Sequence, residues 1–146
     1  EVTQSDLNNA ELNMLSQSSA NSNGVSTLNQ SADGTYNPAQ IQALLDKKAE
    51  KLVVLNLKEL GAFAEYFVLA SATNERQAQA MSDAVEMAMK AEGRRPYSHE
   101  GYHKGAWILL DYGDVVFHLF HEEARRFYGL ERLWGDAPEE TQAFTK

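Results

Sequence analysis

Four histidines in the second half of the chain could bind a metal ion, because neutral imidazole is a common zinc ligand. They are His99, His103, His118 and His121. His118 and His121 belong to an expected strand and are an odd number of residues apart, so their side chains should point to opposite faces. The chain has no cysteine to complete a usual structural zinc site. We therefore expect neither a structural nor a catalytic metal.

Two carboxylates, Asp111 and Asp114, could hold Mg²⁺ beside substrate phosphates, as paired acids do in phosphoryl transfer. They flank Tyr112-Gly113, which is typical of a tight turn. The chain lacks a P-loop and a Gly-Ser phosphate-binding loop ahead of a carboxylate pair. Each acid therefore serves the turn or contacts a partner. A serine such as Ser71 beside a histidine and an aspartate is expected by chance, so we predict no catalytic residue and no cofactor.

Aromatic residues close to arginines are the stronger candidates for function, because protein interfaces use both as anchors. The candidates are Trp107, Tyr112, Phe127, Tyr128, Leu133 and Trp134. Core packing is the alternative for each of them. Phe127 and Tyr128 are adjacent in an expected helix, so at least one should pack inward. The charged neighbours form either a solvated helical face or pairs with a partner: Glu122, Glu123, Arg125 and Arg126.

Trp107 should lie in an antiparallel hairpin. Ala106–Asp111 and Val115–His121 are strongly apolar and flank Tyr112-Gly113-Asp114, where glycine and a short polar residue suit a tight turn. Alternate residues of a strand share a face, so Trp107 and Asp111 should share one. An aspartate on that face indicates that it reaches solvent at one end. We therefore expect Trp107 to be exposed.

The other segments predict a mixed β-sheet covered by helices, in the α/β (α+β) class. Leu52–Leu57 and Tyr66–Ala70 are aliphatic runs typical of buried strands, and both should lie centrally in the sheet. A helix should begin at Asn37-Pro38, with asparagine as the N-cap and proline in the first turn, and end before Leu52.

A second helix is the clearest prediction. Asn74 and Gln77 resemble a capping box, and a stripe of apolar residues follows at helical spacing until Gly93. This helix connects Tyr66–Ala70 to the strand of Trp107, so those two strands should be parallel, with a right-handed crossover. The segment from His99 to Tyr102 should be a loop that leads into the Trp107 strand.

Length and composition predict one domain with polar ends. The chain has 146 residues, of which 43% are hydrophobic. Residues 1–37 are rich in Asn, Ser and Gln and should form a flexible extension, with a short helix over Asp6–Leu15 as the alternative. The domain should span 38–135, followed by a tail over 136–146 that is loose from Glu139. No apolar run approaches the roughly 18 residues of a membrane helix, so we expect no membrane partner.

The net charge of −8 argues against broad nucleic-acid binding, which depends on lysine and arginine displacing counterions from phosphates. The lack of cysteine excludes disulfides and thiolate chemistry and fits a reducing compartment. A partner should therefore be met mainly through protein contacts, with little direct nucleic-acid contact.

Several sequence blocks, taken in order, resemble the ribosomal silencing factor family, also called Iojap-like. The blocks are DKKAEKLVVLNL, AEYFVLASATNERQAQAMSD, EGYHKGAW and WILLDYGDVVFHLFHEEARRFYGLERLW. The resemblance covers the chain from about Pro38 to Trp134. It implies a fold similar to a nucleotidyltransferase sandwich without the catalytic motif, and therefore no enzymatic activity.

The resemblance also implies a partner. Family members bind ribosomal protein fourteen on the joining face of the large ribosomal subunit and sterically block the small subunit. Carried over by matched position, the expected contacts are the hairpin residues first and the following segment second: Trp107, Asp111, Tyr112, Gly113, Asp114, Arg125, Arg126, Leu133 and Trp134. The extension and the tail lie outside the matched blocks and inherit no role.

The resemblance leads to a first hypothesis of a translation repressor that acts on the ribosome, with the bacterial cytoplasm as the expected place. One alternative is a nucleotide-binding or nucleotidyl-transferring enzyme, based on the mixed sheet with Asp111 and Asp114. Another is a self-associating module in which the aromatic face pairs two copies as a homodimer.

Overall fold

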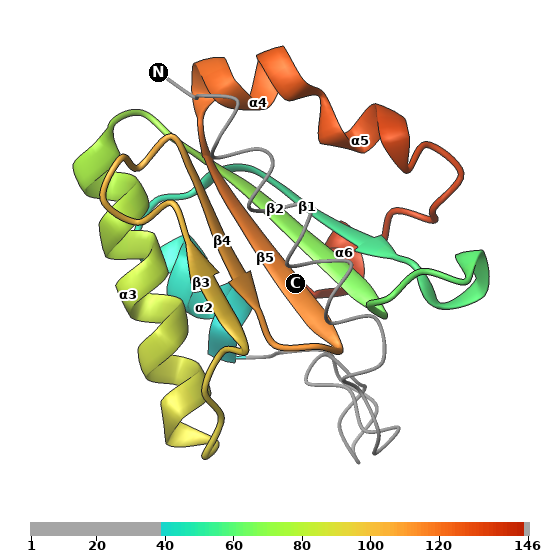
Figure 1. Cartoon of the computed structure of the whole chain (residues 1–146), viewed down its shortest axis with the longest axis horizontal. Coiled ribbons are helices and arrows are strands. Elements are labelled where there is room, and N and C mark those ends of the chain that lie inside the picture. Colours follow the sequence, from blue (N-terminus) through green and yellow to red (C-terminus); the bar gives the residue numbers. More distant parts are fainter. Residues whose placement is uncertain (1–38, 145–146) are drawn as a thin grey trace.

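Five strands form one sheet in the order β1-β2-β5-β4-β3 in the computed structural model, which describes residues 39–144 (Figure 1). The strands are β1 (Glu50–Asn56), β2 (Tyr66–Ala72), β3 (Ser98–Glu100), β4 (Trp107–Asp111) and β5 (Val115–His121). The central pair β2 and β5 is parallel, and every other neighbouring pair is antiparallel. The sheet is therefore mixed, as the sequence predicts, and β4 and β5 form the predicted hairpin.

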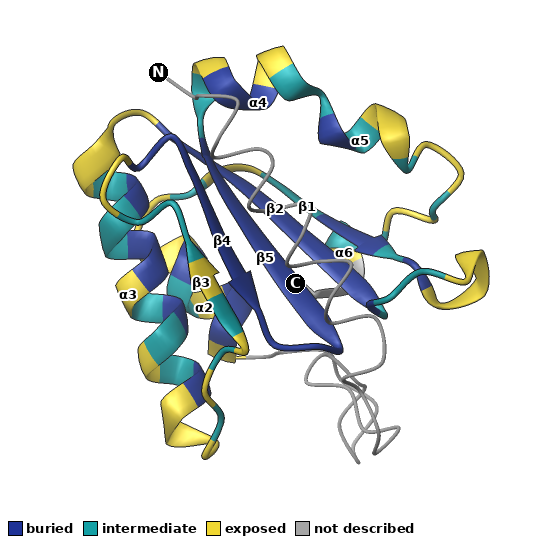
Figure 2. Cartoon of the chain, in the orientation of Figure 1, coloured by how far each residue is buried: buried dark blue, intermediate teal, exposed yellow. Residues whose placement is uncertain are grey.

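Helices cover both faces of this sheet. They are α2 (Ala39–Asp46), α3 (Glu75–Ala91), α4 (Glu122–Tyr128), α5 (Leu130–Leu133) and α6 (Thr141–Phe144), with a 3₁₀ turn η1 (Lys58–Leu60). The helices α2 and α3 pack on one face, and α4 and α5 lie over the other (Figure 1). Figure 2 shows that β2, β4 and β5 are dark blue along most of their length, so the core lies on both sides of the central strands. None of the helices within 39–144 has the length and apolar character to cross a membrane.

Helix α3 has the capping and stripe that the sequence predicts. The Asn74 side chain accepts a hydrogen bond from the Gln77 amide at 2.8 Å, and the Gln77 side chain accepts one from the Thr73 amide at 2.8 Å. Its buried face points at the sheet through Ala78, Met81, Ser82, Val85 and Met89. The first predicted helix appears as α2, but its expected start at Asn37-Pro38 lies outside the described residues, as does the extension before it.

Strand β1 lies at an edge of the sheet, so the prediction that it is central is wrong. Its aliphatic run is explained by cover from the segment after α5. The Asn56 amide donates to the Pro138 carbonyl at 2.9 Å, and the Glu140 amide donates to the Val54 carbonyl at 2.8 Å. The expectation that the chain is loose from Glu139 is therefore also wrong as far as residue 144.

The prediction that the Trp107 strand runs parallel to β2 is wrong, because β5 is the strand that pairs in parallel with β2. The helix α3 instead leads into β3, which overlaps the start of the His99–Tyr102 segment that was expected to be a loop. A three-residue strand is too short to give a periodic signal. The chain then reverses through Gly101, whose φ of +79° is in the left-handed region.

Gly101 supplies a test of this reversal. A Cβ atom at Gly101 would lie 2.0 Å from the Trp107 carbonyl oxygen, whereas one at Gly93, which also has a positive φ, would meet nothing within 4 Å. We expect Gly93→Ala to lower the free energy of unfolding by about 1–2 kcal/mol, the backbone cost alone. Gly101→Ala should cost more, because backbone atoms must also move. Urea denaturation of both variants measures this, and an equal loss for the two would contradict the geometry.

Candidate functional site

The tip of the β4–β5 hairpin is fixed by Arg94, which the sequence analysis did not single out. The Arg94 guanidinium donates to both carboxylate oxygens of Asp114, at 2.7 and 3.2 Å, and to the Tyr112 carbonyl at 2.7 Å. The Asp114 carbonyl accepts from the amides of Glu65 and Tyr66. The tip is therefore tied to the start of β2 and to the segment after α3, and the hydrogen bond with Asp114 is the main cause that raises the pKa of Arg94.

The two hairpin acids serve the turn in this structure. Asp111 is 1% exposed, and its Oδ1 accepts a hydrogen bond from the Gly113 amide at 2.8 Å. Burial raises the pKa of Asp111 to about 6. Asp114 is equally buried and faces Arg94. With Asp111 enclosed and Asp114 matched to a guanidinium, the pair offers no open carboxylates to a metal-bound nucleotide.

Trp107 is buried, with only 4% of its surface exposed, so the expectation that it reaches solvent is wrong. Its indole Nε1 donates to Nδ1 of His118 at 3.1 Å, and its ring lies 5.3 Å from the ring of Tyr128 in α4. His118 is fully buried, and that burial lowers its pKa to about 3, so the imidazole is neutral and can accept this hydrogen bond. The presence of Asp111 on the same face does not indicate solvent there, because Asp111 is itself buried and accepts a hydrogen bond from the Gly113 amide.

Two of the other histidines, His99 and His121, also have structural partners. His121 caps α4 by accepting from the Glu123 amide at 3.3 Å, and His99 lies 2.9 Å from Glu86. His99 also lies 3.4 Å from the hydroxyl of Ser82, which completes a triad-like arrangement, but Ser82 is fully buried in α3 and no substrate reaches it. Within residues 39–144, no group of three or more His, Asp or Glu side chains has the geometry to hold a metal ion.

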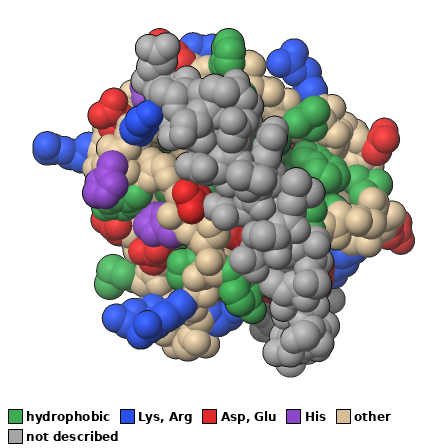
Figure 3. All heavy atoms as spheres, in the orientation of Figure 1, with side chains coloured by type: hydrophobic (Ala, Val, Ile, Leu, Met, Phe, Trp, Pro, Cys, Tyr) green, Lys and Arg blue, Asp and Glu red, His purple; other side chains and the backbone are tan. Residues whose placement is uncertain are grey.

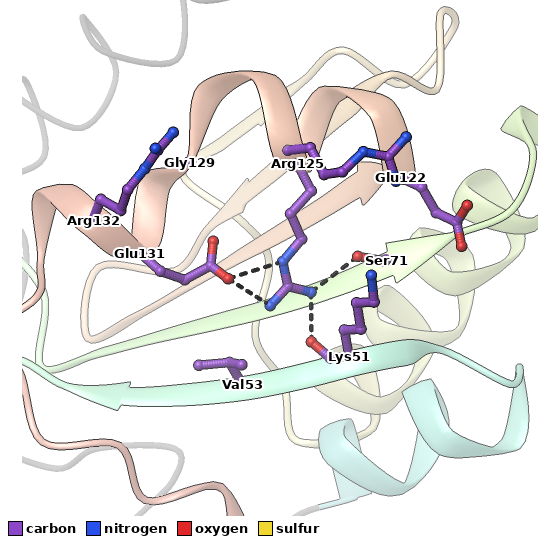
Figure 4. Close-up of a pocket in the computed structure, with 9 residues that line it drawn as sticks. Lys51, Val53, Ser71, Glu122, Arg125, Gly129, Glu131 and Arg132 are labelled. Atoms are coloured by element: carbon purple, nitrogen blue, oxygen red, sulfur yellow. Dashed lines mark hydrogen bonds and ion pairs between the residues drawn. The ribbon is translucent and has the colours of Figure 1, made fainter.

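Arg125 connects four elements and is also buried, at 7% exposure. Its Nε and Nη2 donate to a carboxylate oxygen of Glu131 in α5, at 3.2 and 3.0 Å (Figure 4). Its Nη1 donates to the Ser71 hydroxyl of β2 at 3.0 Å and to the Lys51 carbonyl of β1. Arg125 therefore holds α4 and α5 against the sheet.

The exposed candidates gather on the outer side of α4 and α5. Phe127 is 77% exposed and Leu133 is 74% exposed, which is unusual for large apolar side chains. Trp134 is half-buried, and its ring packs edge-on against Phe67 at 5.6 Å. We define the α4–α5 surface by Arg126, Phe127, Arg132, Leu133 and Trp134. Figure 3 shows hydrophobic side chains in green gathered over α5 and the segment beneath it.

The structure therefore divides the nine predicted contacts into two groups. The enclosed group holds the hairpin and α4: Trp107, Asp111, Tyr112, Gly113, Asp114 and Arg125. The accessible group consists of Arg126, Leu133 and Trp134, all in the α4–α5 surface. Phe127, which the sequence analysis named only as an interface candidate, joins this second group. The sequence analysis did not name Arg132. Its place between Phe127 and Leu133, near the end of the helical segment, could have marked it as an interface residue.

Comparison with known proteins agrees with the resemblance. Residues 31–146 match the family model described as "Ribosomal silencing factor during starvation". The chain is 41% identical over 98 residues to ribosomal silencing factor RsfS of Halalkalibacterium halodurans, which covers 67% of this chain and 84% of that protein. It is 37% identical over 93 residues to ribosomal silencing factor RsfS of Bacillus subtilis, which covers 64% of this chain and 79% of that protein.

A solved structure supports the fold. The chain is similar to a crystal structure of a Chromobacterium violaceum protein, with a TM-score of 0.64 and 32% sequence identity. The match covers 66% of this chain and 81% of that one. The predicted mixed sheet covered by helices is thereby confirmed.

The hydrogen bonds of Arg94 at the hairpin tip predict that Arg94→Ala loses stability. This change removes the guanidinium that faces the buried Asp114 carboxylate and the Tyr112 carbonyl. We expect the free energy of unfolding to fall by about 2–3 kcal/mol. Arg95→Ala, the exposed neighbour, should change it by less than about 0.5 kcal/mol. Guanidinium denaturation measures both, and equal small effects would remove Arg94 from this role.

The buried Asp111 predicts a pH dependence of stability. Its folded pKa of about 6 lies above the ordinary 3.8, so the folded state binds the proton more tightly and gains stability as the pH falls through about 6 toward 4. Asp111→Asn keeps an acceptor for the Gly113 amide but does not titrate. The unfolding free energy of the wild type should therefore rise relative to that of Asp111→Asn by about 2–3 kcal/mol between pH 7.5 and pH 4. A constant difference across this range, measured by urea denaturation, would contradict the burial of Asp111.

Proposed function

Because the chain belongs to the ribosomal silencing factor family, we propose that it binds the large ribosomal subunit through ribosomal protein fourteen and blocks the joining of the small subunit. The protein then represses translation by occupying a surface, without chemistry. Its place of action in this proposal is the bacterial cytoplasm, where the two subunits meet. The curated bacterial relatives carry the name ribosomal silencing factor, which supports the ribosome as the partner.

The observation that carries the proposal is the exposure of Phe127 and Leu133 on the α4–α5 surface. Exposed apolar side chains that lie on adjoining helices, rather than singly as Met87 does on α3, are typical of a surface that a partner covers. Aromatic and leucine anchors beside arginine form the usual centre and rim of a protein interface. In this proposal Phe127, Leu133 and Trp134 bury their apolar atoms against the partner, while Arg126 and Arg132 set the orientation at its rim.

The hairpin residues contribute by position in this proposal. Trp107 packs against Phe120, at 5.1 Å between ring centres, and against Tyr128 of α4. Arg125 holds α4 and α5 to β1 and β2. A surface fixed in this way loses little conformational entropy when it docks, which favours affinity. Six of the predicted contacts therefore act on binding through the placement of the α4–α5 surface and not by touching the partner.

Rigid docking also suits a mechanism of occlusion. A folded domain fixed on the joining face of the large subunit excludes any atoms of the small subunit from the same volume. The affinity for the large subunit then sets the degree of repression, and no nucleotide or metal is required. Enzymatic activity is not part of this proposal, since Asp111 and Asp114 are buried and serve the turn.

The proposal predicts that the double variant Phe127→Ala/Leu133→Ala binds isolated large subunits at least about tenfold more weakly at physiological salt. The variant should also lose the ability to prevent subunit joining. Both residues are exposed, so the free energy of unfolding should stay near the wild-type value. Co-sedimentation with large subunits and a subunit-association assay by light scattering measure the two effects.

Met87→Ala is the matched control, because Met87 is 73% exposed but lies in α3, on the other face of the sheet. It should bind and repress like the wild type. Wild-type affinity in the Phe127→Ala/Leu133→Ala variant would overturn the placement of the contact. A wild-type protein that does not co-sediment with large subunits would overturn the proposed function itself.

A further inference from the structure

A pocket between β1 and the helices α4 and α5 gathers positive charge in a chain whose net charge is −8 (Figure 4). Its volume is about 460 Å³. Lys51, Arg126 and Arg132 line it with exposed cationic side chains. The acids in its lining are Glu131, which Arg125 binds, and Glu122. The pocket is therefore positive, although the molecule as a whole is negative.

The three exposed cations are available to a ligand. Among residues 39–144, no carboxylate lies within ion-pair distance of Lys51, Arg126 or Arg132. Arg125 forms the inner wall, where its charge is matched by Glu131 and its position is fixed by four hydrogen bonds. The pocket thus combines a rigid wall with three cations that form no ion pair with the part of the chain that the structure describes.

The backbone at Lys51 has an unusual conformation. Lys51 has a φ of +51°, in the left-handed region that lysine rarely adopts, and the register of β1 against β2 shifts between Glu50 and Val53. Bulges of this kind redirect side chains and often occur beside functional sites. Here the bulge turns the Lys51 carbonyl to Arg125 and carries the Lys51 side chain to the pocket.

Arg132 is also positioned by the backbone. A Cβ atom at residue 129 would lie 2.3 Å from Nη2 of Arg132, so the guanidinium occupies the space that the missing side chain of Gly129 leaves. Gly129 has a φ of +53° and ends α4. The glycine therefore allows both the turn between α4 and α5 and the close approach of Arg132 along the pocket.

We propose that this pocket binds a backbone phosphate of the large-subunit RNA when the α4–α5 surface docks on its protein partner. The inference rests on the proposed function and deepens it. Arginine and lysine are the usual ligands of phosphate, arginine through paired N–H donors. Arg126 and Arg132 belong to both the pocket and the α4–α5 surface, so a partner that covers the surface also closes over the pocket. Because the chain as a whole carries a net charge of −8, RNA contact should depend on local groups of cations such as this one.

The proposal has a quantitative signature in the salt dependence of binding. Each phosphate neutralised by a cation releases counterions, so the logarithm of the association constant falls with the logarithm of salt concentration by roughly 0.7 per contact on single-stranded RNA. Three cations that neutralise one or two phosphates therefore give a slope of about −0.7 to −1.4. Loss of one contact should reduce the slope by about 1 at most.

Lys51→Asn is the sharpest variant, because Lys51 lines the pocket but lies outside the α4–α5 surface. Asparagine tolerates a positive φ better than lysine does, so the variant should be as stable as the wild type in urea denaturation. We expect it to bind large subunits more weakly at low salt and with a shallower salt slope. Lys51→Asn/Arg126→Gln/Arg132→Gln should reduce the slope further, whereas Lys90→Gln/Arg95→Gln, two exposed cations elsewhere, should keep the wild-type slope.

A second measurement uses the isolated protein and does not depend on the ribosome. Nitrogen-15 NMR spectra are recorded during titration with a single-stranded uridine tetranucleotide, with inorganic phosphate and with a hexaglutamate peptide. We expect the RNA to shift the resonances of Lys51, Arg126, Gly129 and Arg132, with smaller shifts for phosphate and none in the triple variant.

The two measurements separate the failure of this inference from that of the proposed function. If the wild type binds large subunits but the slope is the same in Lys51→Asn and in the triple variant, the pocket does not meet RNA and the inference is overturned. Absence of RNA shifts also overturns it, and shifts from hexaglutamate alone would assign the pocket to an acidic protein segment instead. If the wild type does not bind large subunits at all, the proposed function fails, and with it the assignment of the phosphate to the ribosome.

Discussion

The placement of α4 and α5 on the sheet depends on the buried guanidinium of Arg125. This group bonds to Glu131 in α5, to the Ser71 hydroxyl in β2 and to the Lys51 carbonyl in β1, and it belongs to α4 itself. A buried arginine is tolerated only when its charge is matched and its donors are used, so these four elements must keep their relative positions. Without this interaction α4 and α5 would no longer be fixed on the sheet. The exposed apolar residues and the basic pocket beside them would then lose their defined positions.

Beneath these helices, an aromatic layer gives the same surface its support. Trp107 contacts Phe120 and Tyr128, while Phe67 contacts both His118 and Trp134. The layer joins the hairpin to the end of α5 and encloses His118 completely, and this burial keeps the His118 imidazole neutral. Phe127 and Leu133 remain outside this layer. The buried aromatic residues therefore support the surface from beneath, Phe127 and Leu133 are exposed on it, and the half-buried Trp134 belongs to both.

The sequence predicted those features that short segments encode. The cap and stripe of α3 follow from residues within one helix, and the hairpin from two apolar runs around a glycine. The burial of Trp107 depends on Tyr128, and the fixed turn depends on Arg94 of a different segment, 20 residues before Asp114. Such contacts between distant residues leave no periodic pattern in the sequence. The pocket was missed for the same reason, because Lys51 lines one pocket with Arg126 and Arg132 although about 75 residues or more separate it from them in the sequence.

The central claim is that the α4–α5 surface, and not the hairpin, touches the large subunit. Photocrosslinking tests it most directly, with a benzophenone side chain introduced at position 127 or, as the control, at position 87 of α3. After irradiation with isolated large subunits, mass spectrometry identifies the crosslinked component. Our account predicts a crosslink from position 127 to ribosomal protein fourteen and none from position 87. Crosslinks from position 87 alone, or from position 127 only to other components, would contradict it.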